Sequence, residues 1–134
     1  MRLDMPTSLL LLAVGFSSAS HAGAEALPDP LAAGWRGQQV CVQLYEDTTI
    51  RVLRCTFPPG TGHERHYHAP NFGYVISGGK LRMTDADGTR DQLLLSGTGA
   101  FSEGVDWHEG VNVGETTVVY LIVEPKSLLD GEDL

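Results

Sequence analysis

From residue 38 onward, the sequence is a succession of short β-type runs separated by turns, at intervals of about 8–12 residues. Residues 50–57 and 80–84 are rich in branched and apolar side chains, several of which alternate with polar ones. Pro58-Pro59-Gly60 and Asp85-Ala86-Asp87-Gly88 interrupt the pattern as a break and a turn. This organisation predicts a single all-β domain, either a sandwich or a barrel.

We expect roughly nine strands in this domain. They span residues 40–45, 50–57, 63–68, 72–77, 80–84, 93–95, 100–101, 107–111 and 117–123. Gly78-Gly79 fits a two-residue hairpin turn between the fourth and fifth runs, because such turns need the positive φ angles that glycine adopts freely.

The first 22 residues have a different character. An apolar run at residues 9–16 is followed by Ser20-His21-Ala22, which places small residues at alternate positions. This layout is typical of a secretory signal peptide, here with cleavage after Ala22 or Ala24, and the run is too short to span a bilayer. We therefore predict an exported protein, periplasmic or secreted; a buried N-terminal helix is the alternative interpretation.

The rest of the chain is predicted to form one domain with two extensions. Residues 23–37 are rich in proline and small residues and form an arm, residues 38–126 form the domain, and residues 127–134 form an acidic tail. The net charge of the whole chain is −8, and removal of residues 1–22 leaves it unchanged. An acidic protein of this size repels phosphate backbones and anionic lipids, so we expect neither nucleic acid nor a membrane as partner.

Two cysteines, Cys41 and Cys55, lie in runs that we interpret as the arms of one hairpin. Their nearly opposite positions and the expected oxidising compartment are compatible with a disulfide. A register change of one residue would place the two side chains on opposite faces, so a pair of buried free thiols is the alternative.

The histidines carry the strongest chemical signal. His66 and His68 are two residues apart, so on a strand both imidazoles project from the same face, and His108 offers a third from a distant run. Three neutral imidazoles form the protein half of a catalytic type of transition-metal site, with positions left open for water or substrate. The alternative is that they are ordinary half-buried strand residues.

Four further side chains are candidates for supporting roles. Glu64 shares strand parity with His66 and could act as a general base or a replacement ligand, or simply be a solvated carboxylate. Tyr74 could donate a proton if its hydroxyl reached the site, or be a packing residue. By parity, His63 should face away from His66 and lie at the rim. Asn112 could orient the His108 imidazole or satisfy a turn.

Two segments resemble the conserved motifs of the cupin superfamily. Gly60-x5-His66-x-His68, continuing to Tyr74-Val75-Ile76-Ser77-Gly78, is similar to the first motif, and the segment from Gly104 through His108 to Asn112 is similar to the second. The resemblance extends over about residues 38–125. It implies an antiparallel jelly-roll β-barrel with a divalent metal in its mouth.

The resemblance implies His66, His68 and His108 as metal ligands. The family's glutamate position falls on Asn71, and one extra residue separates Gly104 from the histidine of the second motif. The site would then resemble the three-histidine face of cupin-type thiol dioxygenases. Imidazoles without a carboxylate suit Fe, Ni, Cu or Zn.

The first functional hypothesis is a metal-dependent enzyme, oxygenase-like or lyase/isomerase-like, that acts on a small organic acid or thiol. The alternative is a non-catalytic module that binds a metal or a small ligand, because one fold can support many functions. The resemblance also implies a homodimer formed through exposed strand edges.

Overall fold

The alternation of inward and outward side chains seen in the sequence builds an all-β protein, confirming the predicted fold class. The computed structural model describes residues 25–126. The predicted signal peptide, residues 1–22, and the acidic tail, residues 127–134, lie outside this range. Within it, no helix has the length and apolar character needed to cross a membrane. The strands are β1 Gly34–Trp35, β2 Gln38–Gln39, β3 Cys41–Glu46, β4 Ile50–Phe57, β5 Gly62–His68, β6 Asn71–Ser77, β7 Gly79–Asp85, β8 Gly88–Leu94, β9 Gly99–Ser102, β10 Val105–Asn112 and β11 Val118–Pro125.

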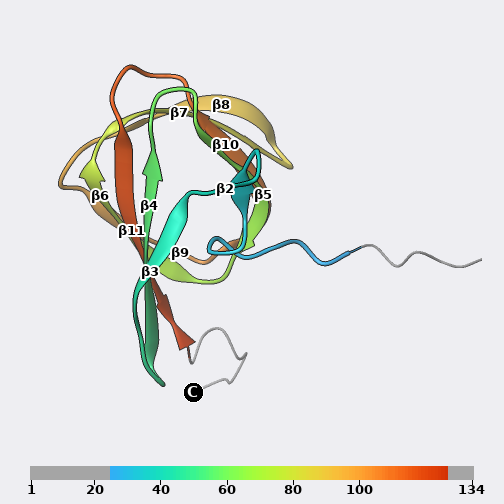
Figure 1. Ribbon diagram of the computed structural model, residues 1–134, viewed down its shortest axis with the longest axis vertical. Helices are drawn as coiled ribbons and strands as arrows, with labels where there is room; N and C mark the ends of the chain where they lie inside the picture. The colour runs from blue at the N-terminus through green and yellow to red at the C-terminus, as the bar shows by residue number, and fades with distance from the viewer. Residues whose placement is uncertain (1–24, 127–134) are drawn as a thin grey trace, which may run out of the picture.

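Two antiparallel sheets face each other in a jelly-roll arrangement (Figure 1). One has four strands in the order β5-β10-β7-β8, and the other has five in the order β3-β4-β11-β6-β9. The chain crosses between them repeatedly, so neighbours in a sheet are distant in sequence, as in β11 between β4 and β6. The sheets form two separate layers and do not join into one closed barrel.

The five-stranded sheet supplies most of the hydrophobic core. Leu53 and Ile122 are almost completely buried, and they face the same interior because they are direct cross-strand partners on β4 and β11. Cys41 and Cys55 are cross-strand partners on β3 and β4 and form a disulfide with a Cα–Cα distance of 4.0 Å. The other buried apolar members of this cluster are Val40, Phe57, Leu81 and Val118.

The predicted hairpin turn at Gly78-Gly79 is wrong. The strands before and after it, β6 and β7, belong to different sheets, and neither glycine has a positive φ angle. Both residues are needed for space instead: a Cβ on Gly78 would lie 2.2 Å from the carbonyl oxygen of Leu94, and one on Gly79 would lie 2.7 Å from a Val118 methyl group. Two glycines are compatible with a hairpin turn, but here they are needed because neighbouring strands leave no room for a side chain.

The described part of the N-terminal arm is fastened along the edge of β5. The carbonyl oxygen of Pro28 accepts a hydrogen bond from the backbone N–H of Tyr67 at 3.2 Å. Asp29 forms an ion pair with Arg51 at 2.7 Å, and the indole of Trp35 lies so close to Gly62 that a Cβ there would collide with it. The arm therefore covers the strand that carries His66 and His68, whose edge would otherwise be free.

Candidate metal centre

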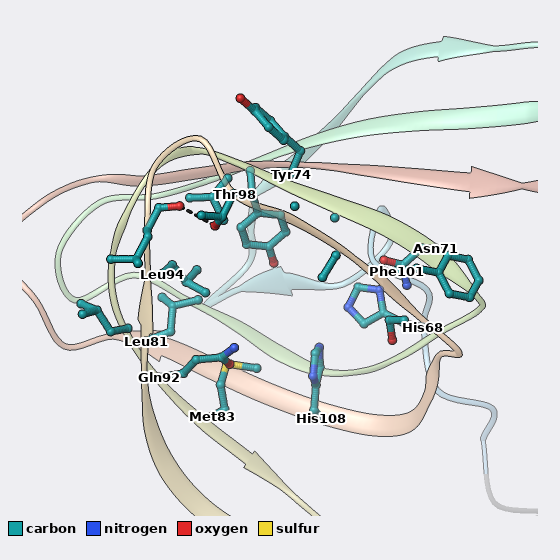
Figure 2. Close-up of a pocket in the computed structure, with 18 of the residues that line it drawn as sticks. His68, Asn71, Tyr74, Leu81, Met83, Gln92, Leu94, Thr98, Phe101 and His108 are labelled. Carbon is teal, nitrogen blue, oxygen red and sulfur yellow. Dashed lines mark hydrogen bonds between the residues drawn. The ribbon is translucent and has the colours of Figure 1, made fainter.

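The three predicted ligand histidines come together on two adjacent strands. β5 carries His66 and His68, β10 carries His108, and His66 and His108 are direct cross-strand partners. Figure 2 shows His68 and His108 at one end of a cavity between the sheets. The antiparallel pairing of β5 with β10 thus joins two segments that are forty residues apart in the sequence.

Two β-bulges adjust which side chains reach the site. On β5, His63 and His66 are three residues apart, but their partners on β10, Gly110 and His108, are only two apart. The extra residue falls at Glu64-Arg65, where both side chains are exposed. A bulge of this kind reverses the inward-outward phase of the residues before it.

The second bulge lies on β10. Val105 pairs with His68 and His108 pairs with His66, so β10 uses one residue more than β5 over this interval. This is the extra residue noted between Gly104 and His108 in the second motif. The bulge accommodates the insertion and keeps the imidazole of His108 directed at the other two.

The ring nitrogens converge closely. The Nε2 atom of His66 lies 3.0 Å from Nε2 of His68 and 3.1 Å from Nε2 of His108. The three ligand atoms all lie within 4.8 Å of one another. Two nitrogens bound to one ion at right angles, each at about 2.1 Å, would be about 3.0 Å apart, so this spacing fits a shared metal ion.

The backbone selects the tautomer of His66. Its Nδ1 atom lies 2.6 Å from the carbonyl oxygen of Glu64, which can only accept, so Nδ1 carries the proton. The neutral ring therefore presents the lone pair of Nε2 to the cluster, as metal-ligating histidines do. His68 is less constrained, because its buried Nδ1 atom has no hydrogen-bond partner in the part of the chain that the structure describes.

Burial keeps the imidazoles neutral. Desolvation lowers the pKa of His66, and together with the neighbouring imidazoles it lowers the pKa of His68 to about 2 and that of His108 to about 4. Neutral rings with free lone pairs are the state that binds a metal ion, so the site needs little proton release at neutral pH.

The predicted position of His63 at the rim is wrong. Because of the β5 bulge, its side chain is only 3% exposed and its ring stacks on His66 with centroids 3.8 Å apart. Its Nε2 atom donates to the carbonyl oxygen of Pro30 at 3.0 Å, and burial lowers its pKa to about 3. His63 therefore connects the N-terminal arm to the ligand cluster: it bonds Pro30 of the arm and packs against His66.

The two proposed proton-transfer residues do not face the cluster. Glu64 shares no face with His66, because it lies in the bulge, and its Oε1 atom accepts a hydrogen bond from the backbone of Arg36 at 2.8 Å. Tyr74 borders the cavity, but it is 40% exposed and its hydroxyl points away from the cavity in Figure 2. Neither predicted role is compatible with these positions.

The two asparagines have different surroundings. Asn71 lines the cavity with His68 and His108, and its Nδ2 atom donates to the carbonyl oxygen of Ala69 at 2.8 Å. Asn112 is buried and bonds the carbonyl oxygens of Phe57 and Thr116 and the backbone N–H of Gly114, which corresponds to the turn interpretation. Asn112 thus closes a loop, and its hydrogen bonds do not include the His108 ring.

Tyr120 lines the cavity but was not among the predicted site residues. It lies on β11 between outward-facing neighbours, so its ring points inward, stacks on Phe57 at 5.4 Å and lines the same cavity as the histidines. Burial raises the pKa of its hydroxyl, which stays protonated at neutral pH. Its parity with the buried Val118 and Ile122 was the available signal, but it indicated packing and not a cavity wall.

Solved structures with the same architecture identify the fold. A cupin domain from Bordetella pertussis Tohama I aligns with a TM-score of 0.61 and 20% identity over 64% of this chain and 91% of its own. A protein with a double-stranded β-helix domain from Klebsiella pneumoniae aligns with a TM-score of 0.54 and 20% identity over 69% of this chain and 82% of its own. The polyketide cyclase RemF from Streptomyces resistomycificus aligns with a TM-score of 0.52 and 19% identity over 63% of each chain.

No protein-family model and no curated protein matches the sequence. The fold and the cluster together define a double-stranded β-helix domain with a three-histidine group able to hold a metal ion. This is the cupin fold, which confirms the architecture implied by the two sequence motifs.

Proposed function

We propose that the protein is a metal-dependent enzyme, oxygenase-like or lyase/isomerase-like, that acts on a small organic acid or thiol. The observation that carries the proposal is the convergence of three neutral imidazole nitrogens, two of which, from His68 and His108, belong to rings that line one end of a cavity of about 510 Å³. RemF, which has the same fold, is an enzyme, so the architecture supports catalysis in at least one relative.

The histidines and the bound ion have distinct proposed roles. His66, His68 and His108 would hold one divalent ion, Fe, Ni, Cu or Zn, because an all-nitrogen ligand set suits these metals. The bound ion would supply Lewis acidity or redox chemistry, and the absence of a carboxylate ligand leaves it more positive. An anionic head group, carboxylate or thiolate, is therefore the favoured partner at this end of the cavity.

Proton transfer falls to Tyr120 in this proposal. Tyr74 and Tyr120 both border the cavity that contains His68 and His108, but the ring of Tyr120 packs in the interior against Phe57, and its neutral hydroxyl can donate a hydrogen bond to a bound molecule. This assignment replaces Glu64 and Tyr74. Asn71 lies at the same end and would position the head group through its side-chain oxygen, since its nitrogen is already bonded.

A non-catalytic metal- or ligand-binding module is the second candidate. It is favoured by one observation: within residues 25–126, no carboxylate lines the cavity that contains the histidines. General acid–base chemistry then depends on a tyrosine and the imidazoles alone.

We also propose the cellular setting and assembly that the sequence predicted. The apolar run and cleavage pattern at residues 9–22 support export to the periplasm or the exterior, and a disulfide between Cys41 and Cys55 is compatible with such a compartment. Exposed apolar residues of β6 that do not line the cavity, such as Phe72 and Ile76, support a homodimer.

A reaction screen with reconstituted protein tests the enzymatic proposal. Protein loaded separately with Fe, Ni, Cu or Zn is incubated with small carboxylic acids and thiols, and oxygen uptake and product formation are measured. Turnover that disappears in His68→Ala and persists in the outer-face variant Tyr74→Phe supports the enzyme. Stoichiometric metal without turnover in any combination favours the binding module.

A further inference from the structure

The cavity beside the histidines has an uncharged lining. It extends from His68 and His108 to Leu81 and Leu94, which lie at the opposite end in the view of Figure 2. Most of its wall is apolar. Within residues 25–126, no lysine, arginine, aspartate or glutamate contributes to it. A charged group on a ligand would therefore find a partner only at the histidine end.

Most polar side chains of the lining are already engaged. The Thr98 hydroxyl donates to the carbonyl oxygen of Leu95 at 2.6 Å, and the Ser102 hydroxyl accepts from the backbone N–H of Gly104 at 3.1 Å. In contrast, the Tyr120 hydroxyl and the Gln92 amide have no hydrogen-bond partner among the described residues. These two groups are free to meet a ligand.

Tyr120 borders two neighbouring spaces in the interior. It lines the main cavity with His68 and His108, and it also borders a smaller void with His66 and Met83. Its ring is held by stacking on Phe57 at 5.4 Å. A rigid aromatic ring with a free hydroxyl at this point can fix the orientation of a ligand without adding charge.

We propose that the cavity binds a monoanion with a single carboxylate or thiolate head at the histidine end, an uncharged apolar body directed toward Leu81 and Leu94, and a hydrogen bond from Tyr120. This inference rests on the proposed function for the placement of the head group. It narrows the substrate class, because dicarboxylates, sugars and zwitterionic amino acids would each bury polar groups against an apolar wall.

Three small molecules that share a two-methylene spacer test the inference: 3-phenylpropionate, succinate and 3-phenyl-1-propanol. The first two have the same head and differ only in the opposite end, which is phenyl or carboxylate, and the third lacks the charged head. Met83 lines the cavity and is the only methionine after Met5, so its ¹³C-labelled methyl group is a site-specific NMR reporter. Titrations are run on zinc-loaded and on metal-free protein.

In zinc-loaded protein, 3-phenylpropionate should saturate the Met83 shift at a concentration at least about tenfold lower than succinate. Burial of a phenyl group in this cavity is favourable, whereas burial of a second, unpaired carboxylate is unfavourable. In metal-free protein, 3-phenyl-1-propanol should still shift Met83, since the apolar body needs no metal. Equal or tighter binding of succinate would overturn the inference. So would a Met83 signal that responds to neither phenyl compound in either state.

Matched variants separate recognition from packing. Tyr120→Phe should weaken 3-phenylpropionate binding about fivefold, because one hydrogen bond is lost, whereas Tyr74→Phe on the outer face should leave it unchanged. Gln92→Arg, at an exposed strand position, should raise the affinity for succinate at least about tenfold. Unchanged binding in both Tyr120→Phe and Gln92→Arg would contradict the proposed orientation. If zinc does not bind but 3-phenyl-1-propanol still shifts Met83, the proposed function fails and the apolar specificity stands.

Discussion

The two main sheets of this domain differ in what their side chains form: one builds most of the hydrophobic core, and the other carries the histidine cluster. The five-stranded sheet holds most of the buried apolar residues and the disulfide, whereas the four-stranded sheet holds the histidine cluster and one exposed strand, β8. All three ligand histidines lie on one strand pair, β5 and β10, at an edge that the N-terminal arm covers.

The difference suggests that folding free energy and chemistry come from separate layers. Leu53 and Ile122 are buried on one sheet, and the three ligand histidines lie on the other. Substitutions in the five-stranded layer should then affect stability and leave the site intact. Substitutions in the histidine cluster should do the reverse.

The largest expected effect is on the five-stranded layer. Leu53→Ala removes a fully buried side chain and should lower the free energy of unfolding by about 2–5 kcal/mol, because it leaves a cavity in the core. Urea denaturation measures this loss, and metal content of the folded fraction should not change. A loss below about 1 kcal/mol would show that this layer does not dominate stability.

A similar but smaller loss should follow removal of the disulfide. Cys41 and Cys55 are 14 residues apart, and a loop of this size corresponds to about 3 kcal/mol of stabilisation through the unfolded state. The variant Cys41→Ala/Cys55→Ala should show this decrease in urea denaturation, and the oxidised parent treated with reductant should approach it. Equal stability of all three samples would mean that the bond contributes nothing.

The pH dependence of stability tests the burial of the cluster. Burial lowers the pKa of His63 to about 3 and that of His108 to about 4, from 6.5. Below pH 6.5 the unfolded chain binds more protons than the folded one, so the metal-free protein should lose stability as pH falls from 7 to 5. Carboxylates such as Asp29 titrate below this window, because their ordinary pKa of 3.8 is lowered further. A melting temperature that is flat or rises as pH falls from 7 to 5 would contradict buried, neutral histidines.

The smallest stability effect is expected at the cluster itself. His68→Ala should change the free energy of unfolding of metal-free protein by less than about 1 kcal/mol, since its buried Nδ1 atom has no hydrogen-bond partner within residues 25–126 and removal of the ring also removes this unsatisfied group. Urea denaturation beside Leu53→Ala gives the comparison directly. A loss as large as that of Leu53→Ala would remove the proposed separation of the two layers.

Much of this architecture could be predicted from periodicity and turn residues. The expected strands at residues 50–57 and 72–77 agree closely with β4 and β6, and the same-face spacing of His66 and His68 placed both rings at one site. These features depend on local alternation, which is visible in a single strand.

Features that depend on a partner strand could not be predicted. The bulge at Glu64-Arg65 exists because β10 provides only one residue, Glu109, opposite these two, and it exchanges the expected facing of His63 and Glu64. Likewise, the packing of one sheet over the other turns the ring of Tyr120 toward the cavity, whereas Tyr74 also borders the cavity but directs its ring away from it.

Metal stoichiometry tests the central claim most directly. Protein is exposed to equimolar Fe, Ni, Cu and Zn, dialysed and examined by elemental analysis, together with His66→Ala, His68→Ala, His108→Ala and the outer-face control Tyr74→Phe. We expect one ion per chain in the parent and in Tyr74→Phe, and less than about a tenth of that in each histidine variant, because removing one of three ligands leaves too few to hold the ion. Negligible metal in the parent, or full retention in the histidine variants, would contradict a metal centre at this site.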